Sequence, residues 1–184
     1  MTRLPSPTAE DIEPDLRPLF AQLMKGRKGP GPGQPLLHHP ALSKHVFALS
    51  SALREGGALA GQVRELTILA TAREVQAPYE WSAHIVAAQA AGVDEAEIAV
   101  IASADNTSGL PARERAVIDG VRSLCRKHCL PDEVYDRLAT HFNARELVEI
   151  VVHAGFYVLL GFVINGFAVD APDPDRVPFR RAGE

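Results

Sequence analysis

Apolar residues recur along most of this 184-residue chain at the three- and four-residue spacing of amphipathic helices, and strand-like alternation is nearly absent. Pro, Gly and two possible capping boxes, Asp94 with Glu97 and Asn143 with Glu146, mark the helix boundaries. The pattern therefore predicts an all-α fold, built as one compact bundle. The predicted helices cover about residues 10–24, 40–54, 59–72, 79–92, 94–103, 111–128, 131–138 and 143–167.

The chain is predicted to be a single domain over residues 1–184, because no interior segment has the composition of a domain linker. Its core is expected to span about residues 35–168. An N-terminal helix and a loop occupy residues 1–37, and the Gly/Pro cluster over residues 26–35 is typical of a loop. The Pro- and Arg-rich tail over residues 170–184 is expected to be extended.

A short internal echo suggests a weak helix-pair duplication. Arg64-Glu65-Leu66 recurs as Arg145-Glu146-Leu147, and each triplet enters a strongly apolar helix. The match covers only three residues, so it predicts a related helix entry and no more.

Composition limits the partners that the chain can have. Hydrophobic residues make up 46% of the sequence and charged residues 23%, as in soluble globular proteins. A net charge of −4 gives no reason to expect nucleic acid or an anionic membrane as a partner. The start has no apolar run typical of a signal peptide, and we expect a cytoplasmic protein with reduced cysteines. The apolar segment 148–169 is broken by His153, Tyr157 and Asn165, which favours a core helix over a membrane span.

Glu80 and His84 are the most informative pair in the sequence. They lie four residues apart in an Ala-rich predicted helix, so both side chains project from one face beside Trp81. A carboxylate and an imidazole held together in an apolar wall can exchange protons, because burial and pairing shift pKa values. The alternative is an ordinary buried ion pair with a structural role.

The last predicted helix carries a second polar row. His153, Tyr157 and Asn165 fall on nearly one face at four-residue steps. Polar groups in so apolar a helix need partners, which a subunit interface, the core or a pocket can supply. His153 and Tyr157 are therefore candidates for lining a substrate pocket.

Several segments together resemble the carboxymuconolactone decarboxylase family, within the AhpD-like superfamily. The resemblance covers about residues 35–168 and implies the AhpD-like helical fold, usually assembled as trimers or hexamers. The segments that carry it are Arg64-Glu65-Leu66-Thr67-Ile68-Leu69-Ala70-Thr71-Ala72-Arg73, Tyr79-Glu80-Trp81-Ser82-Ala83-His84, Ala90-Ala91-Gly92-Val93, Arg113-Glu114-Arg115-Ala116, Arg145-Glu146-Leu147-Val148-Glu149-Ile150 and Gly155-Phe156-Tyr157.

The peroxidase members of that superfamily carry a Cys-x-x-Cys pair before the histidine, and this chain lacks it. The two positions are occupied by Ala77 and Glu80. The cysteines that the chain does have, Cys125 and Cys129, lie on a different predicted helix and match no common zinc pattern. We therefore predict no thiol peroxidase activity, because a disulfide cycle needs a thiolate pair, and we predict no metal site.

The resemblance implies a cofactor-free lyase that decarboxylates a small carboxylated lactone or β-keto acid. In that reading His84 donates a proton, Glu65 and Glu80 orient it, Arg73 anchors a substrate carboxylate and Trp81 lines the pocket. Other activities on the same scaffold stay open, namely isomerisation, hydrolysis or thiol-dependent peroxide reduction, and so does a non-catalytic oligomeric scaffold. A pocket beside His84 would favour an enzyme, whereas a filled core there would favour the scaffold.

Overall fold

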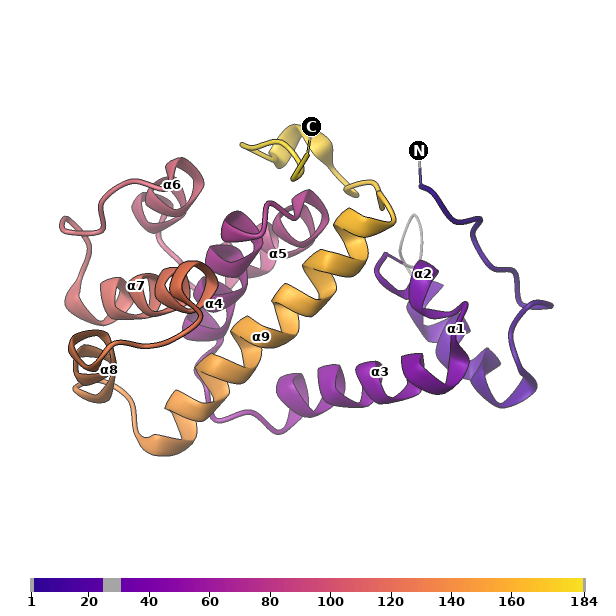
Figure 1. Cartoon of the computed structure of the whole chain (residues 1–184), viewed down its shortest axis with the longest axis horizontal. Coiled ribbons are helices and arrows are strands. Elements are labelled where there is room, and N and C mark those ends of the chain that lie inside the picture. The colour runs from indigo at the N-terminus through magenta and orange to yellow at the C-terminus, as the bar shows by residue number, and fades with distance from the viewer. Residues whose placement is uncertain (1, 25–30, 184) are drawn as a thin grey trace.

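A computed structural model describes residues 2–24 and 31–183. The described part of the chain is helical and contains no strand, as predicted. Figure 1 shows the long α9 running diagonally across the bundle, with α3 extending beneath it and α6 to α8 gathered at the opposite side. The elements are η1 (Pro14–Leu16), α1 (Arg17–Met24), α2 (Gly33–Leu36), α3 (Pro40–Glu55), α4 (Gly61–Glu74), α5 (Pro78–Ala90), α6 (Glu95–Ser103), α7 (Ala112–Lys127), α8 (Asp132–Ala139), α9 (Ala144–Gly166) and η2 (Pro174–Arg176).

Helix α4 is the centre of the bundle, in contact with α5, α6, α7 and α9. Its buried residues are Val63 and every position from Glu65 to Ala72, so the helix is enclosed on nearly all sides. One hydrophobic cluster joins α4 to α5, α6, α7 and α8, and a second joins α4 to α3, α5 and the C-terminal half of α9. The two clusters fix α4, α5 and α9 relative to one another, and these are the helices that carry the candidate site.

The predicted helix boundaries hold where the capping chemistry is strong. Asp94 with Glu97 and Asn143 with Glu146 both form capping boxes, at the starts of α6 and α9. The helix α3 ends at Glu55 before Gly56, as the paired glycines indicate. These local signals operate within one turn, which explains why sequence alone locates them.

The N-terminal region differs from its prediction in two places. The expected helix over residues 10–24 begins only at Arg17, because Pro14 starts a separate 3-10 turn before it. The loop predicted over residues 26–35 contains the short helix α2 from Gly33, while residues 25–30 lie outside the described residues. Buried Gln34 on α2 donates from Nε2 to the carbonyl of Leu4 at 3.0 Å, which ties this helix to the N-terminal segment.

Helix α9 approaches the α4–α5 turn closely at Gly161. A Cβ built on Gly161 would lie 2.6 Å from Cγ2 of Val75, so only glycine fits this crossing. One turn later Asn165 donates from Nδ2 to the carbonyl of Val75 at 2.9 Å. These two contacts set the height of α9 above α5, and with it the position of Tyr157 one turn before Gly161.

The C-terminal tail packs against α5 instead of extending freely. The indole of Trp81 donates to the carbonyl of Arg176 at 2.9 Å, and its ring lies edge-on to Phe179 at 5.4 Å. The hydroxyl of Ser82 donates to the carbonyl of Asp173 and accepts from its N–H, both at 2.9 Å. The predicted extended tail therefore includes the turn η2 and covers the outer side of α5.

The two copies of the Arg-Glu-Leu triplet, at residues 64–66 and 145–147, make different contacts. Glu65 is buried in the second turn of α4, whereas Glu146 caps the N-terminus of α9. Arg145 donates to the carbonyl of Gly56 at 3.2 Å, while Arg64 pairs with the adjacent Glu65. The echo therefore marks two helix entries that pack against each other, and their chemistry is not repeated.

The described residues include one helix, Ala144–Phe167, that is long and apolar enough to cross a membrane by length and composition. It packs against α4, α5, α7 and α8 within the bundle. Its buried face includes Ile150, Ala154 and Ile164, as expected for the core helix predicted from the sequence.

Candidate active site

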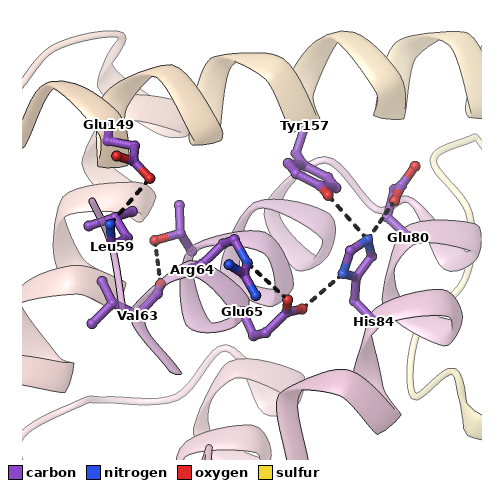
Figure 2. A network of polar contacts seen from close by, with 9 residues as sticks. Leu59, Val63, Arg64, Glu65, Glu80, His84, Glu149 and Tyr157 are labelled. Carbon is purple, nitrogen blue, oxygen red and sulfur yellow. Dashed lines mark hydrogen bonds and ion pairs between the residues drawn. The ribbon is translucent and has the colours of Figure 1, made fainter. Parts of the chain in front are cut away.

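Four helices bring polar side chains together around His84. The imidazole comes from α5, Glu65 from α4, Tyr157 and His153 from α9, and Ser50 from α3. Figure 2 shows the His84 ring between the carboxylates of Glu65 and Glu80, with the Tyr157 hydroxyl directed at it from α9 above. Segments up to 107 residues apart in the chain therefore meet at one ring.

Glu65 holds the Nδ1 side of His84. Its Oε2 lies 2.9 Å from Nδ1, and the side chains of His84 and Glu65 are 22% and 6% exposed. Burial alone would raise the pKa of Glu65, but the hydrogen bond and charge of His84, with Arg64 beside it, bring that pKa below its ordinary value. Glu65 is therefore a carboxylate that can only accept, so Nδ1 of His84 carries a proton and donates.

The Nε2 side of His84 faces two further groups. The hydroxyl of Tyr157 lies 3.2 Å from Nε2, and Oε2 of Glu80 lies 3.5 Å from it. Burial, with the charges of Glu80 and Glu65, raises the pKa of Tyr157, so the phenol stays protonated and can donate. A neutral His84 accepts from Tyr157 at Nε2, and a protonated His84 has a carboxylate at each nitrogen. Nε2 is thus the ring nitrogen at which His84 can gain or lose a proton.

His153 supports this arrangement from behind Tyr157. Its ring is parallel to the Tyr157 ring, with 6.5 Å between centroids, and it is 1% exposed. Nδ1 of His153 lies 3.1 Å from the carbonyl of Glu149, which can only accept, so Nδ1 carries the proton. Burial lowers the pKa of His153, which leaves a neutral ring against the phenol.

Two adjoining cavities open at His84. The larger is a cleft of about 810 Å³ between α3, α5, α9 and the segment that follows α9, and the smaller is a chamber of about 130 Å³ between α3, α4 and α9. We call them the cleft and the inner chamber. Phe47, Phe156 and Leu160 give the cleft apolar walls, a common feature of small-molecule sites. Both cavities are lined by Ser50, Arg54, Glu65, His84, Phe156 and Tyr157.

Two sequence-predicted substrate residues lie outside these cavities. Arg73 is about 12 Å further along α4 than Glu65 by helix geometry, and its Nε donates to the carbonyl of Ala102 at 2.8 Å. Its guanidinium also lies over the Phe179 ring. Trp81 is 1% exposed and packs as a core side chain under the tail. The structure therefore does not bring Arg73 or Trp81 to the cavities beside His84, whereas His153 and Tyr157 line the inner chamber.

Sequence analysis missed three polar residues of the site. Ser50 and Arg54 reach it from α3, and Arg64 lies next to Glu65 with Nε at 3.4 Å from Oε1. Arg64 belongs to the recognised Arg-Glu-Leu entry, so its adjacency to Glu65 was an available signal. Ser50 and Arg54 carried no such signal, because only the path of α3 beside α9 brings them to His84.

The two cysteines lie away from the cavities beside His84. Neither Cys125 nor Cys129 lines the two cavities, and burial raises the pKa of Cys125 to about 11. Ala77, at one expected cysteine position of the peroxidase members, is fully buried near Gly161. Among the described residues, no three His, Cys, Asp or Glu side chains gather as a metal site would require.

Solved structures with this fold include proteins of different description. An uncharacterised peroxidase-related protein with an alkylhydroperoxidase AhpD core, from Ralstonia eutropha JMP134, is 22% identical, with a TM-score of 0.79 over 100% of this chain and 98% of that one. An uncharacterised peroxidase-related protein from Silicibacter sp. TM1040 is 18% identical, with a TM-score of 0.74 over 97% and 95% of the two chains. The debrominase Bmp8, solved with 2,3,4-tribromopyrrole, is 14% identical, with a TM-score of 0.74 over 97% of each chain. At these identities the likeness shows the fold alone.

Part of the sequence matches a known family. No curated protein matches the chain significantly. Residues 40–118, which include α3, α4 and α5 with Glu65, Glu80 and His84, match the model of the carboxymuconolactone decarboxylase family. Residues 40–118 therefore resemble that family, and the chain as a whole has the AhpD-like fold.

Proposed function

We propose that this protein is a cofactor-free, decarboxylase-like lyase acting on a small carboxylated lactone or β-keto acid. The observation that carries the proposal is the hydrogen-bonded chain from Glu65 through His84 to Tyr157, at a cleft that can admit a small molecule. Such a chain lets one nitrogen exchange protons while the other is held fixed. The family match supports the same reaction class.

The reaction needs one bond to break and one proton to move. The bond between carbon and the carboxylate breaks, CO2 leaves, and the electron pair enters an enolate. Protonated His84 then delivers the proton on Nε2 to the carbanionic carbon and becomes neutral. Solvent returns the proton to Nε2, so each turnover consumes one proton and releases one CO2.

Three neighbours assist His84 in this scheme. Glu65 keeps the Nδ1 proton and ion-pairs with the imidazolium at 2.9 Å. Glu80 stabilises the charged ring from the Nε2 side at 3.5 Å. Tyr157, which remains protonated, can donate to the developing enolate oxygen in place of Nε2.

Two enzyme alternatives use the same groups differently. An isomerase would return the proton to another carbon, and a hydrolase would use neutral His84 to activate water. A thiol-dependent peroxidase is disfavoured, because no cysteine lines either cavity. A non-catalytic scaffold is disfavoured because His84 borders open volume where a filled core would suit a structural ion pair.

The test is a screen of carboxy-lactones and β-keto acids for CO2 release, with His84→Gln as the loss-of-function variant. We expect turnover by the wild-type protein and a rate about 10²–10⁴-fold lower in the variant, the usual loss for a general acid. Turnover that survives the substitution within a few-fold would reject His84 as the proton donor. Product formation without CO2 would favour the isomerase or hydrolase.

We also propose that the protein forms a homo-oligomer, a trimer or a hexamer. One side of α9 carries an exposed apolar stripe in which Val148 is 64% and Phe162 68% exposed, with Val151, Val152 and Leu159 between them. A continuous apolar stripe of this length is unusual on a monomer. Phe162→Glu should lower the mass measured by light scattering, whereas Tyr135→Glu on α8, also at an exposed aromatic residue, should not. A monomeric wild-type protein at micromolar concentration would refute the assembly.

A further inference from the structure

The inner chamber beside His84 brings two arginine side chains to a cavity of about 130 Å³. Two guanidinium groups, those of Arg54 and Arg64, line it together with one carboxylate, Glu65. Glu80 lines the cleft and not the chamber, so among the described residues Glu65 is the carboxylate that borders the chamber with the two arginines. The neutral ring of His153 adds no charge of its own.

The two arginines differ in their existing partners. Arg64 is half-buried and lies 3.4 Å from Glu65, whose other oxygen binds His84. Arg54 is exposed in the last turn of α3, and no carboxylate within residues 2–24 or 31–183 forms an ion pair with it. Both guanidinium charges lower the pKa of Tyr157, which places them within electrostatic reach of its hydroxyl. Arg54 is therefore free to bind an anion at the site.

We propose that the inner chamber is the binding site for a substrate carboxylate, held between Arg54 and Arg64, with the Ser50 hydroxyl as a further donor. A planar guanidinium binds a carboxylate through two parallel hydrogen bonds, which fixes orientation as well as position. At about 130 Å³ the chamber has room for a carboxylate group, since one water occupies about 30 Å³ in the liquid.

This proposal rests on the proposed function and refines its substrate class. The anchored carboxylate is the one that the product keeps, because an arginine ion pair stabilises the charge that decarboxylation would remove. The rest of the molecule extends into the cleft past Nε2 of His84, among the apolar side chains of Phe47, Phe156 and Leu160. The expected substrate therefore carries two carboxylates on an apolar body, one that leaves as CO2 and one that survives the reaction.

The test measures binding rather than turnover, so it stands apart from the CO2 screen. Acetate, benzoate, phenylacetate and 3-phenylpropionate, each with its matching neutral amide, are titrated calorimetrically into the wild-type protein, Arg54→Gln, Arg54→Lys and Arg137→Gln. Arg137 is an exposed arginine on α8 that lines neither cavity, so it is the matched control. Histidine-ring NMR of His84 reports whether each acid binds at this site.

We expect at least one acid to bind the wild-type protein more tightly than its amide and to shift the His84 resonances. Arg54→Gln should lower the binding affinity for that acid about tenfold to a hundredfold, the usual loss for a charge-assisted hydrogen bond. Arg54→Lys should retain part of the affinity, and Arg137→Gln should match wild type. Arg64→Gln is a less specific variant, because it also removes a partner of Glu65.

Three results would overturn the carboxylate site. They are equal affinity for acids and amides, unchanged acid binding in Arg54→Gln, and no binding of any acid at millimolar concentration. If acids bind through Arg54 but no compound releases CO2, the carboxylate site stands and the decarboxylase proposal fails. If CO2 is released at a rate that does not depend on Arg54, the decarboxylase proposal stands and the carboxylate site fails.

Discussion

Each end of α4 carries a glutamate with a buried side chain, and the two carboxylates have different kinds of partner. Glu65, 6% exposed, binds the imidazole of His84 at 2.9 Å. Glu74, 9% exposed, binds Arg126 through both oxygens, and Nε of Arg122 lies 3.7 Å away. The two glutamates are nine residues apart, so they project from opposite faces of the helix.

The difference lies in whether the partner can give up its proton. Guanidinium groups stay protonated throughout the physiological range, so Glu74 is in a permanent ion pair that holds α7 against α4. An imidazole can release a ring proton, so of the two ion pairs only the one with Glu65 has a partner suited to proton transfer. Only the Glu65 end borders a cavity where a substrate could use that change.

Replacing either glutamate by glutamine tests this difference. Of the two substitutions, Glu65→Gln should have the larger effect on activity. The amide keeps the size of the side chain but removes the charge that stabilises the imidazolium, so we expect kcat to fall about a hundredfold. Thermal unfolding should change little by comparison. Wild-type activity in Glu65→Gln would mean that Glu65 does not assist His84.

Glu74→Gln should have the opposite effect, with a loss of stability and little change in activity. It leaves Arg122, whose side chain is 12% exposed, without its carboxylate partner, and we expect unfolding free energy to fall by about 2 kcal/mol. Urea denaturation measures the loss, while kcat at low temperature should equal wild type. A Glu74→Gln protein with normal stability and impaired turnover would refute the division of roles between the two ends.

Tyr157→Phe removes the hydroxyl at Nε2 without opening the core. We expect kcat to fall about fivefold with little change in KM, because a neutral hydrogen bond near 1 kcal/mol is lost. His84→Gln is the reference for complete loss of proton transfer. An unchanged kcat in Tyr157→Phe would show that the phenol only packs against the ring.

Acid should destabilise the protein partly through His153. Burial lowers its pKa from 6.5, so the unfolded chain binds the proton more readily than the folded one. Its contribution to stability is complete above about pH 6.5 and is lost as the pH falls through the lower folded value. Tm should therefore fall less steeply from pH 7 to pH 5 in His153→Phe than in wild type. His141→Gln, at an exposed histidine, should keep the wild-type slope.

The smallest effect is expected at Cys125. Its pKa, raised to about 11 by burial and then by the charge of Glu74, leaves almost no thiolate at neutral pH. We expect Cys125→Ala to equal wild type in every activity, and neither protein to reduce peroxide with a dithiol. Dithiol-dependent peroxide turnover that disappears in Cys125→Ala would contradict this expectation.

The helices could be predicted from the sequence because their signals are local. Both capping boxes and the glycines after α3 act within a turn, and the all-α fold follows from the period of the apolar residues. The N-terminal region was less predictable. A Gly/Pro-rich stretch is typical of a loop, so the sequence predicted no helix there. The helix α2 contacts α3 and the N-terminal segment, and sequence spacing does not predict such tertiary contacts.

The site was predictable only along single helices. Glu80 and His84 are one turn apart, so their proximity follows from helix geometry, and Glu65 came from the family resemblance. Arg73 looked suitable as an anion binder, yet its face of α4 turns toward α6 and the tail. Arg54 reaches the inner chamber because α3 lies beside α9. That arrangement depends on tertiary packing, so sequence spacing could not predict it.

The close crossing at Gly161 links site geometry to a residue that touches no part of it. A Cβ there would lie 2.6 Å from Cγ2 of Val75, so either Val75 or α9, which carries Tyr157 one turn away, would have to shift. For protein engineering this separates two kinds of position. Cleft residues such as Val46 and Phe47 on α3 can be varied to change the substrate that fits. Gly161 holds α9 close to the turn between α4 and α5. We expect a library that randomises it to disturb the contact between Tyr157 and His84 without selecting for another substrate.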